Sequence, residues 1–211
     1  MSKKIKRFSD DYFETYNNGV PYGIKGHDRT FDSVEDMMKV IDMIGFSKGR
    51  RTNKQRYIDN VLDVGAANGY LMKRFKEVMG VDVKGVEYND GWCKDNIEKS
   101  IKNDILFGNW FEVCDQFKTN SFDLVIDCIS MYLSPKKSAL CLQECVRVAK
   151  KFVLIIAPII TAVVTDGDDN PIYDPYDTIP WKGKKWCNHF SKACGAKVLV
   201  DYADGYVVGV L

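Results

Sequence analysis

Short apolar runs alternate with amphipathic segments over most of the chain. From Tyr57 onward, five apolar runs predict buried strands, and they lie at 60–64, 83–88, 105–107, 122–127 and 152–157. The longer segments between them predict helices at 70–78, 92–100 and 138–149. Strands that alternate with helices form βαβ units, in which the strands are parallel and helices cover both faces of the sheet. The pattern therefore predicts an α/β fold with three layers.

The end of the chain departs from this alternation. Two further apolar runs, at 196–201 and 206–211, are separated by only four residues. A crossover helix needs a longer connection, so these two strands are expected to form an antiparallel hairpin. The whole sheet is then predicted to be seven-stranded and mostly parallel, ending in an antiparallel hairpin.

The first 56 residues have a different pattern. Aromatic and Gly/Asn clusters precede one predicted helix, which begins at Asp32 or Ser33 and ends at Gly45. Residues 47–56 are basic and nearly devoid of apolar side chains, as expected of an exposed loop. We therefore predict an N-terminal extension or lid at 1–56 and a second domain at 57–211.

Composition narrows the classes of function. The 211 residues include 30 Lys and Arg against 29 Asp and Glu, and this balance gives a net charge of +1. Such a charge does not support bulk binding to nucleic acid or to an anionic membrane, although a local patch remains open. The longest apolar run, 152–160, is too short to span a bilayer. Seven cysteines without a paired CxxC spacing suit a reducing compartment, so a cytoplasmic protein is expected.

The sequence from Asp63 to Gly69 carries the strongest chemical signal. An apolar strand leads directly into Gly65 and Gly69, where the backbone can turn tightly and approach a ligand. The segment lacks the Gly-Lys-Ser/Thr of a phosphate-binding loop and the GxGxxG spacing of dinucleotide folds. The carboxylate of Asp63 would repel a pyrophosphate, which also argues against a nicotinamide-dependent oxidoreductase, but it suits a cationic ligand.

This Asp-x-Gly-x-Ala-x-Gly segment resembles the first motif of class I S-adenosylmethionine-dependent methyltransferases. The family usually has glycine at the position of Ala67, and the resemblance covers roughly residues 57–211. It implies a Rossmann-like fold, S-adenosylmethionine as cofactor, and a reversed seventh strand that corresponds to the terminal hairpin.

The resemblance also implies which side chains contact the cofactor. Glu87 would bind the ribose hydroxyls, Tyr88 would lie along the adenine, and Asn109 would accept from the adenine amino group. Asp104 is a rival for the role of Asn109. The complete set of expected cofactor-binding residues is Asp63, Gly65, Ala66, Ala67, Gly69, Glu87, Tyr88, Asn109, Trp110 and Asp127.

Several of these residues have a purely structural alternative. Trp110 would either pack on the base or belong to the core, and Asp127 would either lie near the methionine moiety or cap the following helix. Glu87 taken alone would be a solvated strand end. Cys187, His189 and Cys194 have no matching fourth ligand, so no metal site is predicted.

The methyl acceptor is not identified by the sequence. A sulfonium donor carries its own activation, so the protein mainly aligns the acceptor, and a general base is needed only for some acceptors. His27 and Tyr132 are the weak candidates for that base. The signatures of DNA amino-group and cytosine methyltransferases are absent. The competing hypothesis is a non-catalytic binding module in a larger assembly, with a protein partner on the N-terminal extension.

Overall fold

The computed structural model describes the central part of the chain almost continuously and its ends in short pieces. The described residues are 9–10, 58–127, 129–130, 133–156, 164–165, 171–172, 192–193, 195, 197–202 and 206–210. The predicted helix that begins at Asp32 or Ser33 and ends at Gly45 lies outside these residues.

Five adjacent parallel strands make up most of the sheet, in the order β3-β2-β1-β4-β5, with β3 at one edge. Their bounds are Asn60–Val64 for β1, Asp82–Glu87 for β2, Ile105–Phe107 for β3, Phe122–Asp127 for β4 and Ala149–Ile156 for β5. The predicted α/β fold with a parallel sheet is therefore confirmed. The order reverses direction between β1 and β4, and ligands of open α/β sheets bind beside such a reversal, at the carboxyl ends of the strands.

Two strands extend the sheet beyond β5. Strand β9 (Tyr206–Val210) pairs antiparallel with β5, and β8 (Lys197–Tyr202) pairs antiparallel with β9 at the edge. The sheet then has seven strands. A separate two-stranded antiparallel sheet is formed by β6 (Val164–Thr165) and β7 (Pro171–Ile172).

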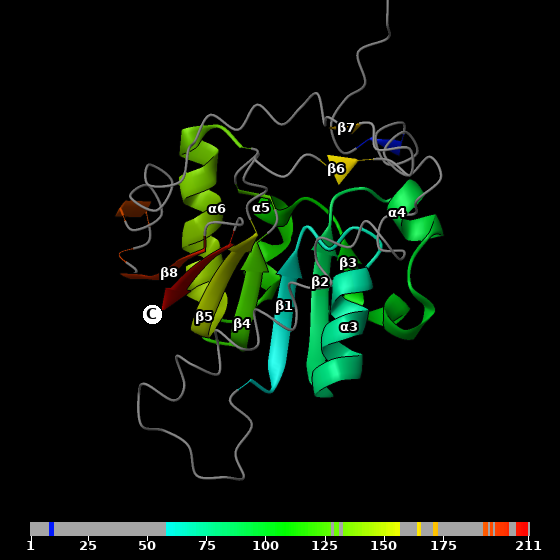
Figure 1. Ribbon diagram of the computed structural model, residues 1–211, viewed down its shortest axis with the longest axis horizontal. Helices are drawn as coiled ribbons and strands as arrows, with labels where there is room; N and C mark the ends of the chain where they lie inside the picture. Colours follow the sequence, from blue (N-terminus) through cyan, green and yellow to red (C-terminus); the bar gives the residue numbers. More distant parts are fainter. Residues whose placement is uncertain are drawn as a thin grey trace, which may run out of the picture.

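Helices cover both faces of the sheet (Figure 1). Helix α3 (Tyr70–Met79) packs on β1 and β2, whereas α6 (Pro135–Val148) packs on β4 and β5. The short helix α5 (Trp110–Val113) and the 3-10 helix η2 (Cys114–Gln116) contribute to the same core as α6. Because both faces are covered, residues of either parity are buried along the central strands, as in β1 and β4.

The helix predicted at 92–100 is wrong in extent. Helix α4 ends at Asp95 (Trp92–Asp95), and the 3-10 helix η1 (Lys99–Asp104) follows it. The backbone N–H and the side-chain amide of Asn96 both donate to the Trp92 carbonyl, which closes the helix. The N–H of Glu98 then donates to the carbonyl of Asn68, so this stretch is held by the turn after β1.

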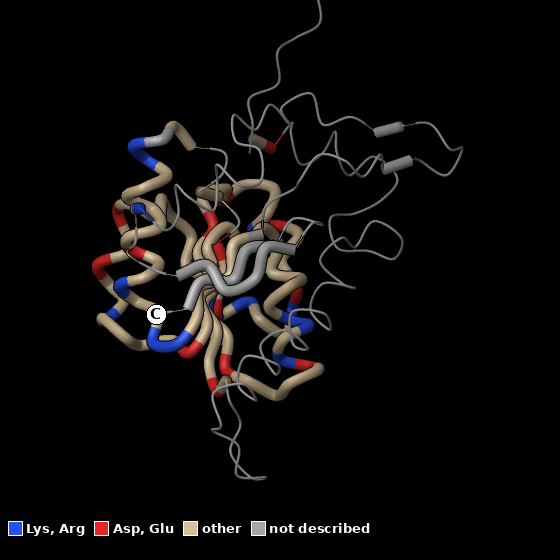
Figure 2. The backbone as a smooth tube through the Cα atoms, turned by 60° about the vertical axis from the view of Figure 1, so that its left-hand side comes forward, with Lys and Arg blue, Asp and Glu red and all other residues tan. Residues whose placement is uncertain are grey.

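Charged residues lie mainly on the helices and loops around the sheet (Figure 2). Strands carry a few charged residues as well, and three buried carboxyl groups among them, Asp63, Glu87 and Asp127, stand at or next to the last residues of β1, β2 and β4. The carboxyl ends of parallel strands meet at one edge of a sheet, so these acids gather at the edge where a ligand is expected. No helix among the described residues has the length and apolar character needed to cross a membrane.

Candidate functional site

The turn between β1 and α3 has an unusual backbone. Gly65, Ala67 and Gly69 have φ values of 90°, 48° and 80°, in the left-handed region that glycine adopts without strain. Gly69 also has no room for a side chain, because an added Cβ would collide with the Ile101 side chain and lie 2.8 Å from Ile105 Cδ1. We refer to residues 65–69 as the glycine turn.

Glu87 holds the glycine turn to the segment that follows β2. Its Oε2 accepts from the backbone N–H of Ala67, and its Oε1 accepts from the N–H of Asn89, both at 2.8 Å. Burial raises the pKa of this carboxyl group, and the backbone hydrogen bonds partly oppose that shift. The backbone N–H of Tyr88 is a third donor, and a carboxylate has about four acceptor sites, so Glu87 retains acceptor capacity for a further hydroxyl group.

Backbone bonds reinforce this junction. The carbonyl of Val86 accepts from the N–H groups of Gly65 and Ala66, at 2.9 and 3.1 Å. The carbonyl of Glu87 accepts from the N–H of Gly108 at 2.8 Å. The segments that follow β1, β2 and β3 are therefore all tied to two adjacent residues of β2.

Asp63 lies on the neighbouring strand and is 1% exposed. It stands in register with Gly85, two residues before Glu87, so the alternation of side chains places Asp63 and Glu87 on the same face of the sheet. This is the face that α3 covers. Among the described residues, no lysine or arginine forms an ion pair with Glu87.

An open cavity of about 590 Å³ lies between the segments that follow β2 and β3. Tyr88 stands on its wall and is 60% exposed. The described residues that line the cavity include no lysine or arginine, but they include three carboxylates. The lining comprises Ser9, Asp10, Tyr88, Asn89, Asp90, Gly91, Phe107, Gly108, Asn109 and Glu112.

Asn109 lies in the cavity wall, as the predicted role requires, but its side chain also has internal partners. Its Oδ1 accepts from the N–H of Phe111 and caps α5, and its Nδ2 donates to Glu112 Oε1, both at 3.2 Å. The amide oxygen thus retains one lone pair for a ligand.

Asp104, the rival for the role of Asn109, lies away from the cavity. It stands before the first residue of β3, and its carboxylate pairs with Lys84 at 2.8 Å and with Lys76 at 3.3 Å. An acid at the amino end of a strand does not reach the carboxyl edge of the sheet, so Asp104 is not a site residue.

Trp110 lies in the apolar core instead of along the cavity. Trp110 is 3% exposed, and the centroid of its ring lies 6.0 Å from the centroid of the Phe117 ring. The ring packs with the core on the α6 side of the sheet. The prediction that Trp110 contacts the base is therefore corrected, because a fully packed ring has no free face to offer a ligand.

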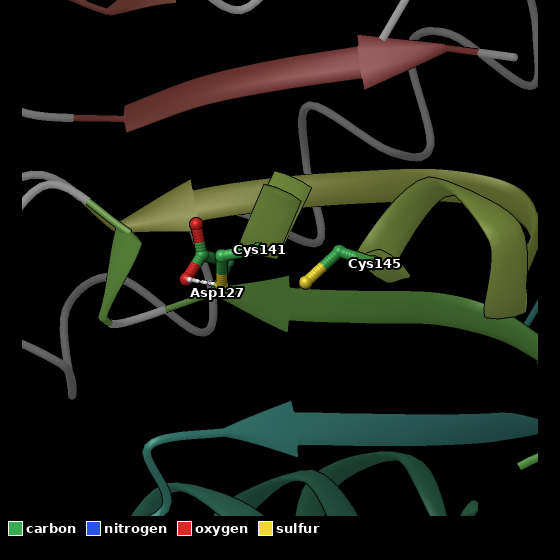
Figure 3. A group of neighbouring side chains, drawn as sticks. All are labelled: Asp127, Cys141 and Cys145. Atoms are coloured by element: carbon green, nitrogen blue, oxygen red, sulfur yellow. Dashed lines mark hydrogen bonds between the residues drawn. The ribbon is translucent and has the colours of Figure 1, made fainter. Parts of the chain in front are cut away.

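Asp127 is fully buried and acts as a cap for the residues that follow β4. Its Oδ1 accepts from the N–H groups of Ile129 and Ser130, at 3.0 and 2.9 Å, and its Oδ2 accepts from the Ser130 hydroxyl. The Cys141 thiol lies 3.9 Å from Oδ1, with Cys145 one turn further along α6 (Figure 3). Burial raises the pKa of Asp127. Although Asp127, Cys141 and Cys145 are close enough to hold a metal, the carboxylate is already engaged by these donors.

Sequence reasoning missed part of the cavity wall. Ser9, Asp10 and Glu112 line the cavity, although they belong to none of the motifs in the sequence. Asp10 accepts a hydrogen bond from Asn89, which lies 79 positions further along the chain. No local pattern identifies a contact over such a distance. The candidate bases His27 and Tyr132 lie outside the described residues, so their roles stay predictions.

The model of the protein family described as "Methionine biosynthesis protein MetW" matches residues 53–159, which is half of the chain. The chain belongs to the MetW family. No curated protein matches the chain.

Solved structures show the same fold at low identity. A SAM-dependent methyltransferase from Aquifex aeolicus is 16% identical, with a TM-score of 0.54 over 83% of this chain and 88% of that one. A SAM-dependent methyltransferase from Archaeoglobus fulgidus is 14% identical, with a TM-score of 0.51 over 87% and 100%. Magnesium protoporphyrin IX methyltransferase from Synechocystis, with bound SAH, is 11% identical, with a TM-score of 0.55 over 96% and 95%. These likenesses confirm the class I methyltransferase fold.

Proposed function

We propose that this member of the MetW family is an S-adenosylmethionine-dependent methyltransferase whose acceptor is unidentified. One observation carries the proposal. The buried carboxylate of Glu87 joins the glycine turn to the rim of an open cavity and keeps acceptor capacity beyond its backbone hydrogen bonds. A ribose offers two adjacent hydroxyl donors, which suit the two oxygens of one carboxylate.

The residues of the cavity fit the rest of an adenosyl group. The exposed ring of Tyr88 offers an apolar face for the base, and Asn109 offers an amide oxygen to its amino group. The surplus of carboxylates, with Asp63 close behind the glycine turn, suits a ligand that carries a sulfonium and an ammonium. When bound, this cofactor supplies an activated methyl group.

The chain itself would bind, orient and shield the reactants. Glu87 and the glycine turn would fix the nucleoside, and the acceptor would enter from the carboxyl edge of the sheet. The N-terminal segment 1–56 is proposed as a lid over the domain formed by 57–211, with His27 or Tyr132 as a base where an acceptor must lose a proton. Cytoplasmic location and a protein partner on the N-terminal segment stay proposals from the sequence.

The alternative of a non-catalytic module is less well supported. A decayed pocket would be filled by side chains, whereas this cavity is open. The changes at Ala67 and Asn109 keep a left-handed backbone and an acceptor oxygen, respectively.

Calorimetry of the full chain with S-adenosylmethionine and S-adenosylhomocysteine tests the proposal. We expect binding by the wild type, and none by the double variant Asp63→Ala with Glu87→Ala. Glu77→Ala is the matched control, since Glu77 is an exposed acid on α3 that forms an ion pair with Arg74 of the same helix. Absence of heat and of a thermal shift with both nucleosides refutes cofactor binding. Incubation of a cell extract with a methyl-tritiated donor then identifies the fraction that accepts the methyl group, and binding without any transfer would favour the non-catalytic module.

A further inference from the structure

Asp10 reaches the cavity from a distant part of the chain. Its Oδ1 accepts from the side-chain amide of Asn89 and from the backbone N–H of Trp92, each at 2.8 Å. These two donors lower the pKa of Asp10, so the side chain is ionised at neutral pH. Through these two hydrogen bonds Asp10 holds both ends of the segment between β2 and α4 in place. This segment forms one wall of the cavity.

Asn89 connects Asp10 to the proposed ribose-binding acid. Its Nδ2 donates to Asp10, its Oδ1 accepts from the N–H of Cys93 at 3.0 Å, and its own N–H donates to Glu87 Oε1. Asn89 is 8% exposed, so this chain of hydrogen bonds is largely shielded from water. A shift of Asn89 would move the donor that orients the Glu87 carboxylate.

Gly91 makes the approach of Asp10 possible. A Cβ added at Gly91 would lie 2.5 Å from both carboxylate oxygens of Asp10, which is closer than real Cβ contacts come. The carboxylate of Asp10 therefore occupies the space that a side chain at position 91 would need. A side chain at this position would displace the Asp10 carboxylate from its present place beside its two donors.

We propose that Asp10 is a positioning residue for cofactor binding, acting through Asn89 on Glu87 and through Trp92 on the cavity wall. This inference rests on the proposed function. It assigns to the N-terminal part of the chain a role in cofactor affinity, in addition to any role in covering the acceptor.

The test measures the affinity of the full chain for S-adenosylhomocysteine by calorimetry. The Asp10→Ala and Gly91→Ala variants are each expected to raise Kd about tenfold, the equivalent of one or two hydrogen bonds. Both changes remove the same contact, so the two losses should not add. The Kd of the double variant should therefore also be about tenfold higher than that of the wild type. Asp10→Asn should stay within about threefold of wild type, since its amide oxygen can accept from the same two donors.

Asp95→Ala is the matched control, because Asp95 is an exposed acid on α4 that does not line the cavity. Unchanged affinity in Asp10→Ala overturns the inference, as do additive losses in the double variant. An Asp10→Asn variant as weak as Asp10→Ala also overturns it, because the charge alone would then matter. Failure of the wild type to bind refutes the proposed function instead, so the two failures are distinguishable.

Discussion

Replacement of Glu87 by glutamine tests the core of the proposed site with almost no change in shape. The wild-type carboxylate accepts from the backbone N–H groups of Ala67 and Asn89, with the N–H of Tyr88 as a third donor, and its remaining acceptor capacity is available to a ribose hydroxyl. In glutamine an NH₂ group replaces one of the carboxylate oxygens. This group is a donor, and it would face a backbone N–H and a ligand hydroxyl that are also donors. A hydrogen bond to a charged group is worth about 1.5–3 kcal/mol, so Kd for S-adenosylhomocysteine should rise about 10- to 150-fold.

The pH dependence of binding gives a second readout of the same residue. Burial raises the pKa of Glu87 above its ordinary value, and hydroxyl donors bind its ionised form. Affinity should therefore be greatest above this raised pKa and fall as the pH drops through it. Glu87→Gln cannot titrate, so its affinity should be flat over the same window.

Calorimetry across pH, with circular dichroism to verify folding, measures both effects, and Glu77→Gln is the control. The glutamine variant leaves one buried N–H without its acceptor, at a cost of about 1–3 kcal/mol. The cost of burying a charge is removed at the same time, so the variant should remain folded. A folded Glu87→Gln protein with wild-type affinity and an unchanged pH profile would show that Glu87 does not bind the ligand.

Three further substitutions test the surroundings of the site. Gly69→Ala should lower the free energy of unfolding by roughly 1–3 kcal/mol, because the backbone at this position is left-handed and the new Cβ would collide with Ile101. Urea denaturation measures this change, and an unchanged stability would contradict the packing described. Ala67→Gly should leave the free energy of unfolding unchanged or raise it by up to about 1 kcal/mol, since glycine relieves the strain of a positive φ. A loss of stability in the same assay would show that this strain is absent. Trp110→Phe should leave the affinity for S-adenosylhomocysteine within about twofold, because the ring lies in the core, whereas a large loss would return Trp110 to the cofactor site.

The central strands could be predicted closely because their signal is local. β1 and β4 begin and end where the apolar runs do, since a strand covered on both faces must be mostly apolar, and the half-buried edge strand β3 also has its predicted bounds. The glycine turn was also found, because its conformation restricts the residues that can occupy it. Glu87 was placed correctly at the end of a strand, although its bonds to Ala67 and Asn89 carry no sequence signal.

The errors have in common that tertiary contacts decided the outcome. The periodicity from Trp92 onward favoured one continuous helix, but the bond from Glu98 to Asn68 directs the chain to the glycine turn instead. Trp110 has the same aromatic character in the core as on a binding surface, so only packing distinguishes the two. Asp10 was missed because a hydrogen bond over 79 positions has no local pattern.

The attachment of three loops to Val86 and Glu87 has a thermodynamic consequence. The backbone that would enclose a nucleoside is already ordered by its own hydrogen bonds, so little conformational entropy is left to lose when a ligand arrives. This part of the protein is preorganised. The ordering of these three loops should accordingly add little to the free-energy cost of nucleoside association at this edge.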